Sequence, residues 1–177
     1  MKKEILSNIK DGELFSVAGI EFIKFFDNDG KTIAVAKESF GDYVFGNNNN
    51  FAESNIKKML EKEVLPKIEK EIGAENIVEH EVDLLAFDGC DKWGKVNCKI
   101  SLPTFDFYRK NVKIFDKHKL DDWWWLATPE TTSEHYNDSW TVCVSPRGLI
   151  GGVRYYRHDG VRPFLIFVSS ISVSCKE

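Results

Sequence analysis

The chain has 177 residues, of which 42% are hydrophobic and 29% charged, and its formal net charge is −4. This composition is typical of one globular domain, which we place at residues 1–177, and it excludes a disordered or fibrous chain. The acidic excess argues against direct binding to duplex nucleic acid, because such proteins usually carry a surplus of Lys and Arg.

No apolar run reaches the roughly 18–20 residues of a membrane-spanning helix. The N-terminus also lacks the apolar core of a secretion signal. We therefore expect no membrane association and a cytoplasmic location, with association with a virion as the other location that the sequence allows. The four cysteines form no C-x2-C pair, so we expect no zinc site. Without a secretion signal, we expect the thiols to be reduced.

The first forty residues predict strands. Residues 13–18 and 20–26 are rich in aromatic and β-branched side chains. Asp29-Gly30 then predicts a hairpin turn, since this pair tolerates the positive φ that such turns need, and residues 31–36 form the returning strand.

A run of four asparagines, residues 47–50, is expected to be a solvated loop before a helical region. Ser54 or Asn55 is the candidate N-cap. Apolar residues then recur at helical spacing to Ile72. Because proline is unfavourable inside a helix, we predict one helix ending near Val64 and a second starting at Pro66.

The middle of the chain is irregular, with a predicted strand at residues 96–102 and a short helix at 103–110. Strands are then predicted at 140–145, 149–156 and 163–173, with turns at Ser145–Gly148 and at residues 157–160. The pair Gly151-Gly152 predicts a close approach of other atoms or a bulge. Strands with two helices and long irregular loops indicate an α+β fold with antiparallel sheets.

The last third carries a motif. It consists of Trp124-Trp125-Leu126-Ala127-Thr128-Pro129, followed by Ser145-Pro146-Arg147-Gly148 and by Gly160-Val161-Arg162-Pro163. It resembles an uncharacterised bacterial and phage family whose hallmark is W-W-L-R-S-P followed by G-V-R-P. The resemblance implies a C-type-lectin-like fold, similar to that of formylglycine-generating enzymes. The chain departs from the pattern at Ala127 and Thr128, where the family has Arg and Ser.

Two residues of this motif have a structural interpretation. Side chains alternate along a strand, so Trp124 should face one side and Trp123 and Trp125 the other. We expect Trp125 in the core and Arg162 held by hydrogen bonds rather than by a ligand.

Candidate binding residues lie in two stretches. The first is the polar loop Glu130–Asp138, because ligands of C-type-lectin-like folds bind near this sheet and loops often carry binding residues. Its candidates are Glu130, Glu134, His135, Tyr136, Asn137 and Asp138. Oxygen ligands here would suit calcium, but the Glu-Pro-Asn type of triplet is missing, and we expect neither a metal nor another cofactor.

The second stretch is rich in arginine and tyrosine, which are enriched at protein interfaces. Its candidates are Arg147, Arg154, Tyr156, Arg157 and His158. On an alternating strand Arg154 and Tyr156 share a face, while Tyr155 and Arg157 share the other. Ordinary sheet packing is the alternative interpretation of this stretch.

The sequence contains no nucleophile elbow, P-loop, H-E-x-x-H or G-x-G-x-x-G motif. We therefore expect a non-enzymatic recognition domain that binds a protein or a glycan, associated with a phage or mobile element. A second hypothesis is an intracellular phage-encoded inhibitor of a host defence protein, similar in role to an anti-CRISPR. A third, an enzyme, would depend on Cys143. The sequence leaves the oligomeric state open.

Overall fold

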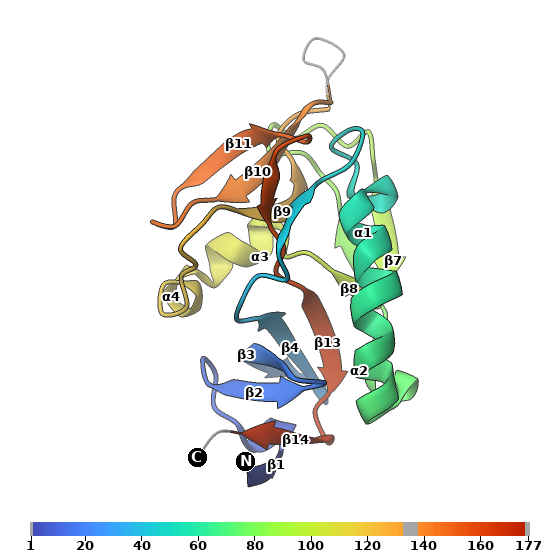
Figure 1. The fold of residues 1–177 in the computed structure, drawn as a ribbon, viewed down its shortest axis with the longest axis vertical. Helices are drawn as coiled ribbons and strands as arrows, with labels where there is room; N and C mark the ends of the chain where they lie inside the picture. Colours follow the sequence, from blue (N-terminus) through green and yellow to red (C-terminus); the bar gives the residue numbers. More distant parts are fainter. Residues whose placement is uncertain (1, 133–137, 176–177) are drawn as a thin grey trace.

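A computed structural model describes residues 2–132 and 138–175 (Figure 1). It has an α+β fold with mostly antiparallel sheets, one long helix and several short ones, as the sequence predicts at this level. None of the helices in the described ranges combines the length and apolar character needed to span a bilayer.

The larger sheet has seven strands in the order β1-β14-β2-β3-β4-β13-β8. The first and last strands of the chain pair with each other, so the two termini lie side by side at one end of the molecule (Figure 1). The strands are β1 (Lys2–Ile5), β2 (Leu14–Val17), β3 (Ile20–Asn28), β4 (Lys31–Ala36), β8 (Ile100–Ser101), β13 (Phe164–Val168) and β14 (Ser172–Cys175).

The predicted hairpin is confirmed. Residues Asp29 and Gly30 join β3 to β4, and both have positive φ, at 49° and 71°. The predicted single strand at residues 163–173 is wrong. Strand β13 ends at Val168, and the chain turns at Ser169, whose N–H donates to the Gly30 carbonyl, before β14 pairs with β1. The apolar residues of this stretch predict a strand, but they do not show that its first part pairs with β4 and its last part with β1.

The second sheet has five strands in the order β11-β10-β9-β12-β5, so β11 is an edge strand. All its pairings are antiparallel except the one between β12 and β9. The strands are β5 (Asp42–Val44), β9 (Trp124–Pro129), β10 (Trp140–Val144), β11 (Ile150–Arg154) and β12 (His158–Gly160).

A third sheet contains only β6 (His80–Asp83) and β7 (Lys95–Cys98). The single strand predicted at residues 96–102 is therefore wrong. It divides at Lys99 into β7, which pairs with β6, and β8, which pairs with β13.

The predicted pair of helices is also wrong, because α1 (Asn55–Met59), the π-helical turn η3 (Leu60–Val64) and α2 (Leu65–Ile72) form one continuous helix. The Ser54 hydroxyl caps it, accepting from the Lys57 N–H at 3.0 Å. At the junction Val64 keeps helical angles, φ −102° and ψ −55°. In the π turn the hydrogen bonds run from residue i to residue i−5, as from the Leu65 N–H to the Leu60 carbonyl. This shift moves the carbonyls away from the Pro66 ring, so the helix continues beyond the proline.

The remaining helical segments are short. The helix predicted at residues 103–110 is confirmed as α3, which begins after its cap Thr104. These segments are η1 (Leu6–Asn8), η2 (Phe51–Glu53), η4 (Ala74–Asn76), α3 (Phe105–Lys110) and α4 (Val112–Phe115).

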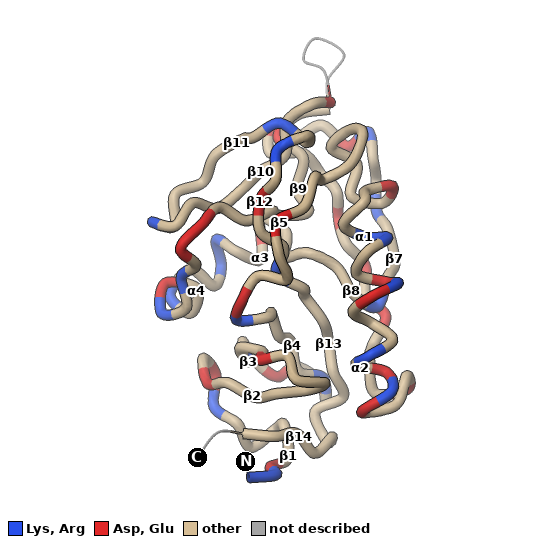
Figure 2. The backbone as a smooth tube through the Cα atoms, viewed as in Figure 1, with Lys and Arg blue, Asp and Glu red and all other residues tan. Residues whose placement is uncertain are grey.

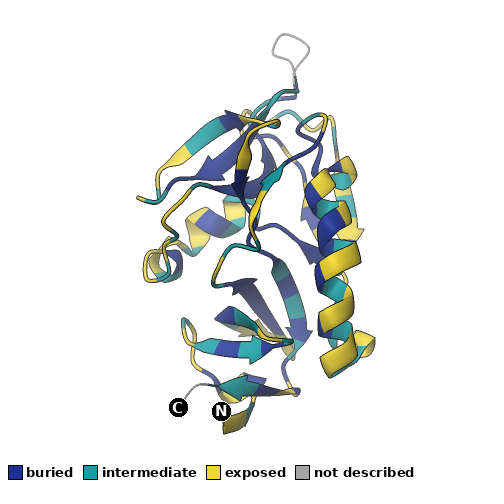
Figure 3. Ribbon diagram, viewed as in Figure 1, coloured by how far each residue is buried: buried dark blue, intermediate teal, exposed yellow. Residues whose placement is uncertain are grey.

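Two apolar cores fill the molecule, and the tryptophan motif contributes to both. Trp125 is fully buried against the long helix and the larger sheet, whereas Trp124 packs with α3 and α4 on the other side of the second sheet. This confirms the predicted alternation. Figure 3 shows the long helix buried along one side and exposed along the other. Its exposed side carries charges of both signs (Figure 2).

Arg162 is structural, as predicted. It is 1% exposed, and its Nε donates to the Ala36 carbonyl at 2.9 Å and its Nη1 to the His118 carbonyl at 3.3 Å. Its guanidinium lies 5.0 Å from the centre of the Trp124 ring. Burial lowers the pKa of Arg162 to about 10.

Candidate functional site

The edge of the second sheet gathers arginine and aromatic side chains. Arg154, at the end of β11, is the cross-strand partner of Trp140 on β10. Its guanidinium carbon lies 5.3 Å from the Trp140 ring centre and 5.8 Å from that of Tyr156. We call the group Trp123, Trp140, Arg154, Tyr155, Tyr156 and Arg157 the arginine–aromatic edge.

The chain turns within this group. The Arg157 N–H donates to the Arg154 carbonyl at 2.9 Å, so the turn lies at residues 154–157 and His158–Gly160 is strand β12. The predicted turn at 157–160 and the extension of β11 to Tyr156 are therefore wrong. Arg154 and Tyr156 are nevertheless brought together, by the turn instead of by strand alternation.

Tyr155 and Tyr156 have different environments although their rings meet edge to face at 5.6 Å. Tyr155 is half-buried, and its backbone bonds to Ser139 and to Phe45. Tyr156 is 53% exposed. The first ring therefore supports the second from below, and the second faces solvent.

Arg157 and His158 are both exposed but differ in their contacts. Arg157 lies over the Trp123 ring at 5.9 Å and pairs with Asp159 at 3.0 Å. Burial raises the pKa of Asp159, while the Arg157 charge acts in the opposite direction. His158 is exposed at the start of β12. Arg157 is thus partly committed to a buried carboxylate.

Cys143 lies next to the Arg157–Asp159 ion pair, with its Sγ 3.9 Å from the Asp159 carboxylate. Burial and the neighbouring carboxylate raise its pKa well above the ordinary value. A thiol acts as a nucleophile through its thiolate, which this environment disfavours.

The glycine pair of β11 confirms the predicted close approach. A Cβ on Gly151 would lie 3.2 Å from the Trp123 ring, and one on Gly152 would lie 2.5 Å from the Glu130 carboxylate. The two glycines therefore let Trp123 and Glu130 approach the strand closely from opposite faces. Glu130 is thereby placed on the same face as Arg154, since Gly152 and Arg154 are two residues apart.

Asn49 closes the base of the loop that joins β9 to β10, and the expected solvated asparagine loop is therefore wrong at this position. It is fully buried, and its Nδ2 donates to the carbonyls of Thr131 and Trp140, both at 2.8 Å. Its Oδ1 accepts from the Trp93 indole at 2.9 Å. Every polar group of the side chain is used. No local pattern within residues 47–50 sets Asn49 apart from its neighbours, so this role had no signal in the sequence.

Asp138 pairs with Lys92 at 3.8 Å, and its carbonyl accepts from the Asn49 N–H. Glu134, His135, Tyr136 and Asn137 lie outside the described residues. Within residues 2–132 and 138–175, no three His, Cys, Asp or Glu side chains gather as a metal site would require.

The structure separates Arg147 from the other candidates. Strands β10 and β11 pair from Trp140 with Arg154 at one end to Val144 with Ile150 at the other. Arg147 lies in the turn beyond that second end, roughly 15 Å from the arginine–aromatic edge at the usual rise of a strand. Arg147 and Arg154, which were predicted to share one site, thus lie at opposite ends of the β10–β11 hairpin.

Comparisons with known proteins give no match: no family model, no curated protein and no solved structure matches the chain.

Proposed function

We propose that the chain is a non-enzymatic recognition domain of C-type-lectin-like fold that binds a protein through the arginine–aromatic edge. The observation that carries the proposal is the exposed Arg154 guanidinium, which lies against Trp140 and Tyr156 on an edge strand. Arginine, tyrosine and tryptophan are the residue types that dominate the energy of protein interfaces.

A protein fits this edge better than a glycan does. Its exposed side chains are arginine and aromatic residues, the types enriched at the centre of protein interfaces. Within the described residues Arg154 makes no ion pair, so its donors remain available to a partner.

The C-type-lectin-like assignment is supported by the motif itself. Trp125 is buried between the sheet and the long helix, and its indole donates to the Tyr43 carbonyl. Arg162 joins β4 to the segment before β9. A motif whose residues hold the two sheets together is expected to specify a fold rather than an activity.

The test begins with capture of partners from bacterial lysate by the tagged protein, with and without a calcium chelator, read by mass spectrometry. A partner captured at fixed stoichiometry regardless of chelator would then be purified. Replacing both Arg154 and Tyr156 by Ala should weaken its binding by about 2 kcal/mol or more, as for other interface hot spots. Arg147→Ala is the matched control, because it removes an exposed arginine at the far end of the hairpin.

Equal affinity of the wild type and the double variant would contradict the proposed face. Capture of glycans that depends on calcium would contradict the choice of a protein ligand.

A further inference from the structure

A second surface, on a different sheet, has an unpaired strand edge. Among the strands of residues 2–132 and 138–175, β6 pairs with β7 alone, in a two-stranded sheet. The Leu84 N–H donates to the Gly94 carbonyl at 2.9 Å in the same register. Since backbone groups of alternate residues point to the same edge, those of Val82 and Leu84 face β7. Those of Glu81 and Asp83 face away from it.

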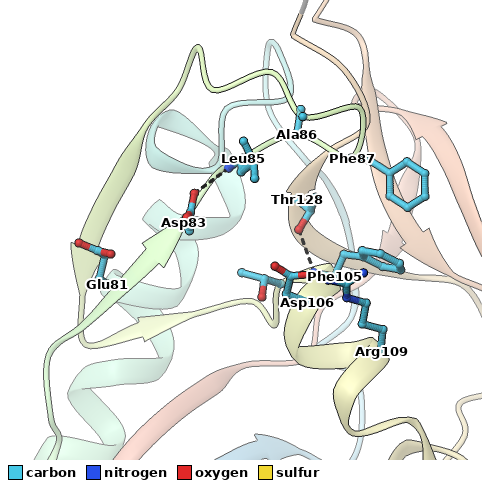
Figure 4. Close-up of a pocket in the computed structure, with 11 residues that line it drawn as sticks. Glu81, Asp83, Leu85, Ala86, Phe87, Phe105, Asp106, Arg109 and Thr128 are labelled. Carbon is cyan, nitrogen blue, oxygen red and sulfur yellow. Dashed lines mark hydrogen bonds and ion pairs between the residues drawn. The ribbon is translucent and has the colours of Figure 1, made fainter.

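Two adjoining hollows run along this edge. The larger, about 370 Å³, lies between β6, the segment 85–89 and α3, and the smaller, about 180 Å³, extends along β6 toward β13. They share Glu81 and Thr104, and β6 lines both whereas β7 lines neither. Figure 4 shows the larger hollow, with Glu81 and Asp83 on one side and Asp106 and Arg109 across from them. The free edge of β6 is therefore one wall of a groove.

The rim of the groove is apolar. Leu85 is 45% exposed and Phe87 is 55% exposed, and the Phe87 ring meets the Phe105 ring edge to face at 4.9 Å. The backbone of Phe87 is fixed, because its N–H donates to the Pro129 carbonyl at the end of β9. Large apolar side chains held together at the surface mark interaction sites.

The charge of the groove is acidic. Its lining includes the carboxylates of Glu81, Asp83 and Asp106, against the single guanidinium of Arg109. Asp106 pairs with Arg109 at 2.8 Å, and Glu81 pairs with Lys95 at 2.7 Å from across the hairpin. Asp83 accepts the Leu85 N–H and has no ion pair among the described residues. Charge complementarity therefore favours a basic ligand.

We propose that the groove between β6 and α3 binds an extended basic peptide segment of a partner protein, which adds a strand to the free edge of β6. Its backbone bonds to the outward groups of Glu81 and Asp83. Because side chains of an added strand alternate, apolar residues enter the hollow beside Phe87 and Phe105. Lysine or arginine residues between them meet the carboxylates. This site is separate from the arginine–aromatic edge and does not depend on the function proposed for it.

The probe is a fluorescein-labelled hexapeptide of alternating lysine and valine, whose binding to the full chain is followed by fluorescence anisotropy at low salt. The decisive pair of variants is Glu81→Pro and Glu81→Thr. Both remove the charge, but only proline removes the outward N–H, and it leaves the bonds to β7 intact. A single lost hydrogen bond should make binding to the proline variant roughly three- to tenfold weaker than to the threonine variant.

A second measurement avoids any change to the protein. The same peptide with N-methyl groups at alternate positions cannot donate to the outward carbonyls of Glu81 and Asp83, and it should bind the wild type at least roughly three- to tenfold more weakly. The Arg154→Ala/Tyr156→Ala variant should bind the unmodified peptide as the wild type does.

Four results would overturn the proposal. They are equal binding to the proline and threonine variants, equal binding of a glutamate–valine peptide, no binding below about 1 mM, and a dimer that Glu81→Pro abolishes without any peptide binding. The last would assign the edge to pairing between two copies of the chain.

Discussion

Cationic side chains have opposite environments in the interior of the molecule and at the arginine–aromatic edge. Inside, Lys24 on β3 is 1% exposed, and its Nζ donates to the carbonyls of Leu6 and Ser7. Arg162 is equally buried and also donates to main-chain carbonyls. At the edge, Arg154 and Arg157 are exposed and lie over aromatic rings.

The difference shows which cations are available to a partner. A buried cation whose donors are bound to carbonyls joins segments that are distant in the sequence, and its loss leaves those carbonyls unsatisfied. Arg154, an exposed cation that lies over two rings and makes no ion pair among the described residues, has donors open to solvent or to a ligand, whereas Arg157 is partly engaged by Asp159. We therefore expect mutations inside to change stability and mutations at the edge to change binding.

The largest effect is expected at Arg162. Arg162→Ala removes two hydrogen bonds to carbonyls and the contact with Trp124, and it leaves a cavity, so the free energy of unfolding should fall by about 3–5 kcal/mol. Urea denaturation measures this change. Arg154→Ala is the control and should alter the free energy by less than about 0.5 kcal/mol. A similar loss in both variants would remove the distinction between the two regions.

A smaller loss of stability is expected from a change at Asn49, which joins the interior to the loop between β9 and β10. Asn49→Asp replaces two donated hydrogen bonds with a carboxylate that faces two carbonyls, and should cost roughly 2–3 kcal/mol at pH 7. Thermal unfolding of this variant and of Asn47→Asp, which changes an exposed residue of the same run, measures the difference. Equal stability of the two variants would contradict the role given to Asn49.

The smallest effect concerns the carboxylate beside Lys24. Burial acts to raise the pKa of Asp27, but hydrogen bonds from Lys24, Thr32 and Ser169 outweigh it and lower the pKa. A lowered pKa in the folded state means that the stabilisation is present above about pH 4, the ordinary range of the group. It is lost as the pH falls through the folded-state value.

Denaturation of the wild type and of Asp27→Asn across this range measures that contribution. The stability difference between the two proteins should shrink as the pH falls. Because Asp27 is partly exposed, the effect should also weaken at high salt. A difference that stays constant with pH would show that the charge of Asp27 contributes nothing.

The sequence predicted features that depend on neighbouring residues. The turn at Asp29-Gly30, the cap at Ser54 and the alternation of Trp124 and Trp125 follow from local φ, hydrogen bonding and strand geometry. Two of the failures depend on distant partners. The burial of Asn49 depends on Trp93 and Trp140, and the division at Lys99 depends on which sheet each half joins.

The candidate site shows the same limit. Arg154 and Tyr156 were predicted to lie together, and they do. The cause is the turn at residues 154–157, which the alternating pattern did not reveal. Arg147 was grouped with them by composition, and only the register of β10 with β11 separates it. The groove beside β6 was not predicted, since its walls come from four separate segments, residues 80–89, 102–109, 128 and 164–166.

The pairing of β1 with β14 determines how the protein can be handled in an experiment. Both termini lie at the end of the molecule opposite the β10–β11 hairpin (Figure 1). A fluorophore, an immobilisation handle or a fused protein at either terminus would therefore point away from the arginine–aromatic edge. A sensor surface coated through one terminus would present that edge to solution, and energy transfer between dyes on the two termini would report separation of the first and last strands.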